Sequence, residues 1–269
     1  NIYRSDLIIV THINLIIYLF FLFFSNKKIL LFSYGLDIWG NKKNLLYQIF
    51  LKKIKYFISM REYTLNKQKE IYNLKPRLDY LLHNPLDRTK KKLIFNKRKK
   101  IILTVARLDS REKYIGIDET LEAMAMIKNI KFKYYVVGDG TDKKRLMKKA
   151  KKLKIDHHVS FKGYLNDKAK NILFKEAKVF LMPGSRGTFD TYPYRFAFLE
   201  AASNALHIIA SYPLKNEIVE AQQYKNFNFV NPKNRNQLIK KILNLLNKKN
   251  FYCDKLLQNH SLTIFNQKL

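Results

Sequence analysis

Short runs of β-branched and other apolar residues alternate with longer amphipathic stretches along the chain, and this alternation constrains the fold more than any other feature. Short apolar runs bounded by Gly, Pro, Asn or Asp are typical of strands that are buried on both faces. Regular strand–helix alternation predicts parallel sheets covered by helices. We therefore expect an α/β protein with two doubly wound parallel sheets.

The alternation occurs in two blocks. In the first block the predicted strands are residues 7–10, 29–33 and 56–60, and the predicted helices are residues 15–24, 43–55 and 65–72. The lysine-dense residues 88–100 predict a solvated linker between the blocks. In the second block the predicted strands are residues 101–105, 134–137, 159–161, 179–182 and 207–210. The predicted helices are residues 117–127, a stretch after Gly140, residues 168–177 and residues 194–203.

The helix expected after Gly140 is rich in lysine. Its apolar residues Leu146, Met147, Ala150 and Leu153 recur at helical spacing. One apolar stripe implies an opposite polar face. We therefore expect the lysines of this helix to face water.

The chain has a formal net charge of +31, because 52 Lys and Arg stand against 21 Asp and Glu. Such a balance favours an anionic partner: a nucleic acid, an acidic membrane surface or a phosphorylated substrate. The abundance of Lys, Asn, Ile, Phe and Tyr also fits a genomic compositional bias, so the net charge alone does not identify which of these anionic partners the protein binds. The single cysteine, Cys253, excludes a disulfide framework. The histidines lack ligand spacing, so we expect no metal site.

Residues 7–24 contain no charged side chain and just reach the length of a membrane-spanning helix. However, Leu7-Ile-Ile-Val10 followed by a polar stretch predicts a buried strand and a loop. Residues 15–24 alone would cover about half of a membrane at roughly 1.5 Å per residue. We therefore expect a buried strand and helix. Attachment to a membrane surface stays open, because apolar side chains beside Lys27 and Lys28 would suit it.

Polar and glycine-rich residues follow the predicted strands of the second block, where parallel sheets bind ligands. Arg107, with Lys113 on the same loop, could hold a diphosphate, although ordinary surface ion pairs explain these residues equally well. Gly138-Asp139-Gly140 permits a tight turn and the close approach of a ligand. The segment from Phe161 to Tyr164 could contact a nucleobase, although a simple turn is the commoner use of such a segment.

The segment from Pro183 to Ser203 is the richest in candidate groups. Pro193 suits a first helical turn, so phosphate or sugar oxygens would meet a helix N-terminus here. Glu200 lies further along the helix among apolar neighbours and needs a hydrogen-bonding partner. We favour the hydroxyl groups of a ribose as that partner over an internal salt bridge to a lysine.

Taken in order, these motifs resemble glycosyltransferase family 4, whose members have the GT-B fold of two Rossmann-like domains. The resemblance covers nearly the whole chain. In the second block it rests on Val105-Ala-Arg-Leu108, Gly116-Ile-Asp118, Val137-Gly-Asp-Gly140, Phe161-Lys-Gly163, Pro183, Phe198-Leu-Glu-Ala-Ala202 and Ile208-Ile-Ala-Ser211. Ser33-Tyr-Gly-Leu-Asp-Ile-Trp39, Ile58-Ser-Met-Arg-Glu-Tyr-Thr64 and Asn84-Pro-Leu-Asp87 resemble the later part of the acceptor domain, and Ser261-Leu-Thr-Ile-Phe265 resembles the closing segment. It implies an acceptor-side domain over residues 1–90, incomplete at its N-terminus, and a nucleotide-sugar domain over residues 91–258. Residues 259–269 would form a closing segment that crosses back to the first domain.

The resemblance implies retaining transfer of a sugar from a UDP- or GDP-linked donor, without a cofactor or a metal. Arg107 matches the position that holds the diphosphate, Glu200 the position that binds the ribose, and Phe161 and Tyr164 the wall against the base. The residues implied in catalysis are Arg107, Lys113 and Asp190. The residues implied in donor binding are Gly138, Asp139, Phe161, Tyr164, Tyr192, Tyr194, Arg195, Phe196 and Glu200.

Three positions depart from the pattern of the family. Tyr192 stands in place of the first glutamate of a Glu-x7-Glu pair, Ile115 in place of a lysine, and Tyr34 in place of a histidine. The neighbouring Asp190 and Lys113 are the residues that would replace the missing carboxylate and the missing lysine.

The resemblance predicts an enzyme of surface polysaccharide or glycolipid synthesis that acts on a glycan or lipid-linked acceptor. We expect it in the cytoplasm, at the inner face of the membrane and in contact with anionic lipid. The alternative is a non-catalytic relative that binds a sugar nucleotide or a lipid. Nucleic acid is not an expected partner, because the sequence lacks an RNP-like aromatic platform and zinc-finger spacing.

Overall fold

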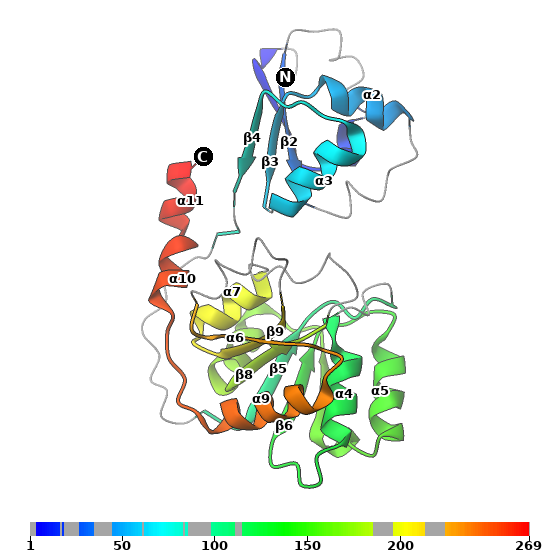
Figure 1. Cartoon of the computed structure of the whole chain (residues 1–269), viewed down its shortest axis with the longest axis vertical. Helices are drawn as coiled ribbons and strands as arrows, with labels where there is room; N and C mark the ends of the chain where they lie inside the picture. Colours follow the sequence, from blue (N-terminus) through cyan, green and yellow to red (C-terminus); the bar gives the residue numbers. More distant parts are fainter. Residues whose placement is uncertain are drawn as a thin grey trace. The chain divides into compact units, whose positions relative to one another are not determined.

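The computed structural model of the chain describes residues 4–16, 18, 27–34, 45–60, 62–82, 84–85, 98–110, 115–184, 196–212 and 224–268. The chain divides into two compact units, one of Asn1–Pro85 with Phe265–Leu269 and one of Leu86–Ile264. Both units combine a parallel sheet with helices, as Figure 1 shows. The expectation of two parallel α/β sheets is confirmed. The domain limits drawn from the sequence stay a prediction.

The first unit contains a four-stranded parallel sheet in the order β1-β2-β3-β4. Its elements are β1 (Leu7–Val10), β2 (Lys28–Ser33), α2 (Leu45–Lys53), β3 (Tyr56–Ser59), α3 (Glu62–Tyr72) and β4 (Leu78–Leu81). The sheet and its helices bury one apolar cluster that includes Val10, Leu31, Leu51, Phe57 and Tyr72. Burial of these side chains is the main driving force for the unit.

Two features of the first unit differ from the sequence prediction. Strand β1 lies at one end of the described sheet, and Leu7 and Ile9 are 48% and 56% exposed, so the expectation of a fully buried strand was wrong. Strand β4 was not predicted, because it is a short end strand with mostly partly exposed residues and no apolar run. Of the predicted helix at residues 15–24, residues 17 and 19–24 lie outside the described residues.

The second unit contains a six-stranded parallel sheet in the order β10-β9-β8-β5-β6-β7. Its strands are β5 (Ile101–Val105), β6 (Lys133–Val137), β7 (Val159–Gly163), β8 (Val179–Met182), β9 (His207–Ser211) and β10 (Phe227–Val230). Its helices are α4 (Ile117–Ala125), α5 (Lys143–Lys152), α6 (Asp167–Glu176), α7 (Phe196–Ser203), α9 (Arg235–Asn247), α10 (Asp254–Asn259) and α11 (Leu262–Lys268), the last continuing into the residues grouped with the first unit.

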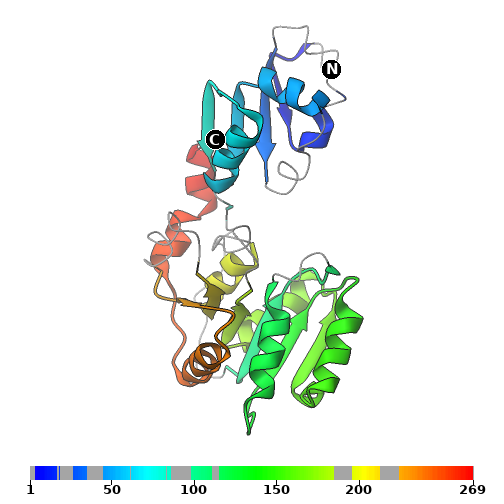
Figure 2. The same ribbon diagram turned by 45° about the vertical axis from the view of Figure 1, so that its right-hand side comes forward.

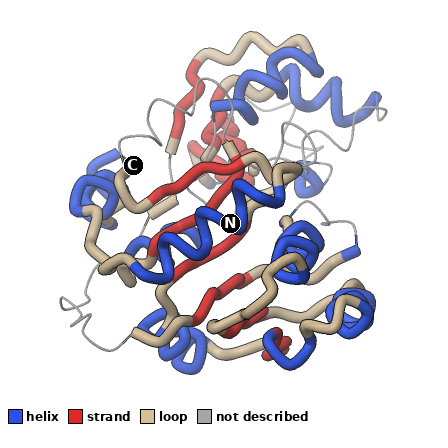
Figure 3. Tube along the Cα trace, turned by 60° about the horizontal axis from the view of Figure 1, so that its bottom comes forward, coloured by secondary structure: helices blue, strands red, loops and turns tan. Residues whose placement is uncertain are grey.

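The strand order reverses direction once. The chain runs outward from β5 to β6 and β7, returns to the other side of β5 as β8, and continues to β9 and β10. Because such crossovers are almost always right-handed, the reversal places α4 and α5 on one face of the sheet and α6 and α7 on the other. Figure 2 shows α4 and α5 side by side, and Figure 3 shows helices on both faces. The reversal creates a topological switch point between β5 and β8.

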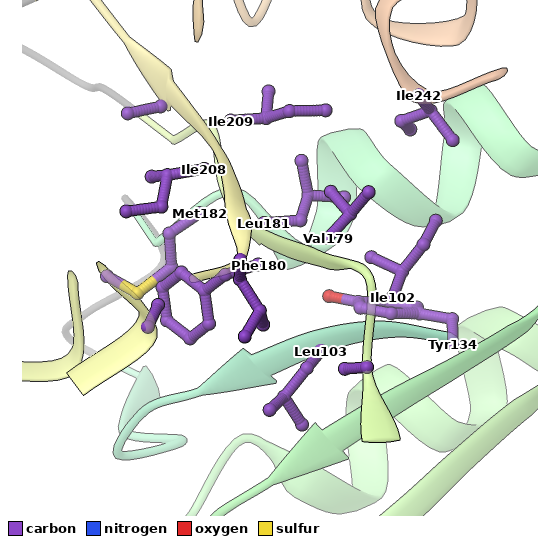
Figure 4. Packing of buried hydrophobic residues seen from close by; sticks show 14 of the residues in the cluster. Ile102, Leu103, Tyr134, Val179, Phe180, Leu181, Met182, Ile208, Ile209 and Ile242 are labelled. Carbon is purple, nitrogen blue, oxygen red and sulfur yellow. The ribbon is translucent and has the colours of Figure 1, made fainter. Parts of the chain in front are cut away.

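The core of the second unit lies on both faces of the sheet. Figure 4 shows Ile102 and Leu103 of β5, Phe180 and Leu181 of β8, and Ile242 of α9 packed together. Tyr134 is fully buried, and its hydroxyl group lies 2.9 Å from Oγ1 of Thr104. Burial raises the pKa of Tyr134, so this phenol stays protonated and the interior stays uncharged.

Strand β10 and helix α9 complete the second unit and were not predicted from the sequence. Helix α9 buries Leu238, Ile242, Leu245 and Leu246, and it contacts α4, β8 and β9. It therefore covers the same face of the sheet as α4. No helix within the described ranges combines the length and the apolar character needed to cross a membrane.

Candidate functional site

The switch point is lined by two glycines whose backbones touch. Gly116 precedes α4 with φ +91°, and a Cβ atom on it would lie 2.2 Å from the backbone nitrogen of Gly184, which follows β8. The Gly184 N–H donates to the carbonyl of Ile115 at 3.1 Å. Only glycine at position 116 allows this approach, because any side chain there would enter the Gly184 backbone. The loops after β5 and β8 are therefore held together where open parallel sheets bind ligands.

The loop after β6 packs against the loop after β5 with equal closeness. A Cβ atom on Gly138 would lie 1.8 Å from the carbonyl oxygen of Ala106, and one on Gly140 would lie 2.3 Å from that of Leu108. The Leu108 N–H donates to the Asp139 carbonyl at 2.9 Å, and the Asp142 N–H donates to the Leu108 carbonyl at 2.8 Å. These contacts fix the backbone on both sides of Arg107.

Arg107 lies at the edge of a small pocket. The pocket is lined by Arg107, Leu108, Asp109, Ile115, Ile117, Asp118, Asp142 and Leu146. Arg107 is exposed, whereas Asp118 and Asp142 are 7% and 5% exposed. The pocket therefore combines the exposed cationic side chain of Arg107 with the buried carboxylates of Asp118 and Asp142.

Those two carboxylates share one arginine. Arg145 donates to both oxygens of Asp118, at 2.8 and 2.6 Å, and to both oxygens of Asp142, at 2.6 and 2.7 Å. Burial opposes the charge on Asp118, but the bonds from Arg145 and Lys149 outweigh it and lower the pKa of Asp118 to about 2. The bonds to Asp142 and Asp118 raise the pKa of Arg145. Asp118 and Arg145 are therefore both charged at neutral pH.

The ion-pair network extends across α4 to α9. Lys149 lies 2.6 Å from Asp118 and 2.5 Å from Glu122, and Arg235 of α9 lies 2.5 Å from Glu122. On α5, Lys143 also pairs with Asp139 at 2.8 Å. The expectation that the lysines of α5 face water was therefore wrong for Lys149, which pairs with carboxylates of α4, whereas Lys143 pairs with Asp139 at the exposed surface.

The end of β7 adjoins this group. The Gly138 N–H donates to the Gly163 carbonyl at 2.8 Å, which joins the ends of β6 and β7. Phe161 is partly buried and packs against the core, whereas Tyr164 is 81% exposed. Of the two residues expected to line a base, Tyr164 thus presents an accessible ring, and Phe161 contributes mainly to packing.

Glu200 and Phe196 belong to α7, on the other face of the sheet. Phe196 is the first residue of the helix and is 59% exposed. Glu200 pairs with Lys170 of α6, whose Nζ lies 2.7 Å from Oε1 of the carboxylate. The sequence favoured a ribose over a lysine as the partner of Glu200; within the protein its partner is the lysine.

Five of the residues named from the sequence lie outside the described residues: Lys113, Asp190, Tyr192, Tyr194 and Arg195. Two of the positions that depart from the expected pattern are described. Ile115 is 6% exposed and packs in the core, whereas Tyr34 follows β2 and is 50% exposed. Within the described ranges, no cluster of three or more His, Cys, Asp or Glu side chains forms a possible metal site.

The sequence analysis did not single out Arg145 and Asp142, which the structure joins to Asp118 beside the Arg107 pocket. Both lie just after Gly138-Asp139-Gly140 and are spaced three residues apart, a spacing at which opposite charges meet on a helix. That spacing was a usable signal. Their link to Asp118, 27 residues from Arg145, becomes visible only in the folded chain.

Solved structures with a similar fold include a galactosyltransferase and two proteins solved in complex with UDP. The lipopolysaccharide outer core galactosyltransferase WaaB, in its apo form, matches with a TM-score of 0.70 and 15% identity over 98% of this chain and 73% of its own. Anabaena Alr3699/HepE, in complex with UDP, matches with a TM-score of 0.74 and 14% identity over 98% of this chain and 77% of its own. S. aureus TarM, with UDP and α-GlcNAc-glycerol, matches with a TM-score of 0.69 and 16% identity over 91% of this chain and 50% of its own.

These likenesses show that the fold is that of the GT-B glycosyltransferases. Comparison with curated protein sequences gives no significant match. The family described as "Glycosyl transferases group 1" matches residues 86–260, which is more than half of the chain and includes all of the switch point. The chain therefore belongs to the group 1 glycosyl transferase family.

Proposed function

We propose that the chain is a retaining glycosyltransferase that moves a sugar from a UDP- or GDP-linked donor to a glycan or lipid-linked acceptor. The observation that carries the proposal is the position of Arg107, an accessible cation at the switch point of a sheet that matches the family. In the reaction, the bond between the anomeric carbon and the diphosphate oxygen breaks. The acceptor hydroxyl oxygen bonds to that carbon on the same face, and its proton passes to the departing diphosphate oxygen.

Each named residue has a role in this proposal. Arg107, with Lys113, stabilises the negative charge that develops on the departing diphosphate. Glu200 accepts hydrogen bonds from the ribose, and the accessible ring of Tyr164 lies against the base. Asp190 supplies the carboxylate that faces the donor sugar. Gly138 and Asp139 shape the turn beside the donor.

The remaining donor-binding residues belong to the start of α7 and the segment before it. We assign the sugar and its adjacent phosphate to Tyr192, Tyr194, Arg195 and Phe196. The charge balance supports the assignment, because a cationic chain attracts a donor that carries a diphosphate. No metal or other cofactor is part of the proposed reaction.

The test is release of nucleoside diphosphate by the full chain. UDP-glucose, UDP-galactose, UDP-N-acetylglucosamine and GDP-mannose are each incubated with a bacterial lipid extract as acceptor. The proposal predicts donor-selective release of UDP or GDP that increases with acceptor and persists in EDTA. The anomeric configuration of the product, read by NMR, should be that of the donor.

Binding of a donor without turnover would support the alternative, a non-catalytic relative that binds a sugar nucleotide. The replacement of a family glutamate by Tyr192 is the observation that favours this alternative. An Asp190→Asn variant separates the two. It should abolish turnover of an enzyme and leave donor binding by a non-catalytic relative intact.

We further propose that the enzyme acts in the cytoplasm at an anionic membrane surface, in polysaccharide or glycolipid synthesis. Four exposed lysines of α5 form a stripe at helical spacing, and none makes an ion pair with a described residue: Lys144, Lys148, Lys151 and Lys152. A lysine close to an anionic bilayer contributes roughly 1 kcal/mol to binding. The stripe therefore supports the proposal through charge complementarity.

Vesicle flotation tests this surface. Binding to phosphatidylglycerol vesicles, but not to phosphatidylcholine vesicles, should weaken when all four lysines of the stripe are replaced by glutamine. The matched control removes the same charge from exposed lysines near α9: Lys233, Lys240, Lys248 and Lys249. Equal loss in both variants would show a general charge effect and would contradict a specific surface.

A further inference from the structure

We propose that Arg145 is a positioning residue for the donor diphosphate, which it affects by holding the loop that carries Arg107. The inference rests on the proposed function. In this role Arg145 does not itself contact the diphosphate. Its Nε, Nη1 and Nη2 groups donate to the carboxylates of Asp118 and Asp142, so its hydrogen bonds are used within the protein.

Arg145 is linked to the loop after β5 through Asp142. Asp142 receives two bonds from Arg145, and its backbone N–H donates to the carbonyl of Leu108. Leu108 is the neighbour of Arg107. Because glycine has no side chain, the backbone of Gly140 packs directly against the carbonyl group of Leu108. A shift of Asp142 would therefore move the residue next to Arg107.

Arg145 is also linked to the other side of the switch point, through Asp118. Asp118 lies in the first turn of α4, two residues after Gly116, whose backbone touches that of Gly184. Arg145 thus ties the start of α5 to the start of α4. The N-terminal ends of α4 and α5 therefore hold the loop that carries Arg107 on two sides. One side lies next to the loop after β8, and the other lies next to the loop after β6.

The link through Arg145 requires the geometry of a guanidinium group. A guanidinium group can bind two carboxylates through paired hydrogen bonds, whereas the single ammonium group of a lysine cannot reproduce that fork. The side chain of Arg145 is 40% exposed. The carboxylates of Asp118 and Asp142 are only 10% and 7% exposed, so loss of Arg145 lowers stability as well as removing the fork, and binding is compared between variants that fold.

The experiment compares affinities for a nucleoside diphosphate and its nucleoside. UDP against uridine, and GDP against guanosine, are titrated by calorimetry into the full chain and into Arg145→Gln. The ratio of the two affinities measures the diphosphate contribution alone. We expect that ratio to fall about tenfold, the loss of one hydrogen bond to a charged group, with nucleoside affinity unchanged. A variant that was merely less stable would lose both affinities.

The matched control is Arg235→Gln, which removes the other arginine of the same network. Among the described residues, Arg235 donates hydrogen bonds to Glu122 and to the carbonyl of Pro232 and none to the Arg107 loop, so the affinity ratio should stay at the wild-type value. Arg145→Lys should keep the positive charge at position 145, but it should recover the wild-type ratio of diphosphate to nucleoside affinity only in part. If Arg145→Gln fails to fold, as circular dichroism would show, Asp142→Asn breaks the same tie with a smaller change.

The outcomes separate the inference from the proposed function. An unchanged ratio in Arg145→Gln, or an equal fall in Arg235→Gln, would overturn the positioning role while leaving the proposed function intact. Full rescue by Arg145→Lys would also overturn it, because charge alone would then suffice. A wild-type chain that binds neither UDP nor GDP would overturn both.

Discussion

The ammonium group of Lys170 lies 2.7 Å from Oε1 of Glu200, so α6 and α7 are joined by an ion pair on one face of the sheet. The two side chains are 17% and 33% exposed, which limits screening by water. Burial lowers the pKa of Lys170, but the hydrogen bonds to Glu200 and Asp167 outweigh it and raise that pKa overall. A ligand would thus meet a Glu200 carboxylate that Lys170 has already oriented.

A double-mutant cycle measures this pair. Lys170→Gln, Glu200→Gln and the double variant should show a coupling of roughly 0.5–1 kcal/mol in the free energy of unfolding, as partly exposed ion pairs do. The control cycle uses Lys175→Gln on the same helix, an exposed lysine without an ion pair to a described residue. Equal coupling in the two cycles would show that the pair does not form in solution.

Two glycines of the site should differ in their tolerance of alanine. Gly138→Ala should destabilise the chain by roughly 3 kcal/mol or more, because its Cβ would lie 1.8 Å from the Ala106 carbonyl. Gly163→Ala should cost only about 1–2 kcal/mol, because it has a left-handed φ of +70° and no contact closer than 3.4 Å. Urea unfolding measures both. Similar losses would contradict the close packing of the β5 and β6 loops.

The stability of the second unit should depend on pH through His207. Burial lowers its pKa from 6.5 to about 4, assisted by the charges of Lys178, Lys248 and Arg98 and opposed by a hydrogen bond to the backbone of Lys249. The unfolded chain binds the proton near pH 6.5 and the folded chain only near pH 4. The free energy of unfolding should therefore fall by about 3 kcal/mol as pH decreases across this range.

Unfolding of the wild type and of His207→Gln between pH 7 and pH 4 checks the prediction. The variant should lose most of the pH dependence in this range. His157→Gln, which replaces an exposed histidine, should retain it. A variant at His207 with the slope of the wild type would show that another group carries the pH dependence.

Much of the fold follows from local sequence, because apolar strands in a parallel sheet are nearly continuous hydrophobic runs. The run Ile101–Val105 predicts β5, and Val179–Met182 predicts β8. The end strands carry a weaker signal. Strand β4 is partly exposed, and β10 is four residues long and contains an asparagine. Such strands are stabilised by pairing with a neighbour, which the local sequence does not encode.

The site depends more strongly on tertiary structure. The sequence places Arg107 and Gly138 after successive strands, and the structure brings their loops together as parallel strands require. The Lys170–Glu200 pair and the Arg145 bridge join residues 30 and 27 positions apart on neighbouring helices. Helical periodicity identifies which face of a helix is buried, but it does not say which charges the next helix will present to that face.

Donor binding by the full chain tests the proposed site at Arg107 and Glu200. UDP, GDP and their sugar conjugates are titrated by calorimetry into the wild type, Arg107→Ala and Glu200→Ala, with Arg77→Ala in the first unit as the control. We predict that the wild type binds one donor, that both site variants weaken binding by about tenfold or more, and that the control does not. No donor binding by a folded wild-type chain, or binding that is unaffected by both site variants, would contradict the proposed site.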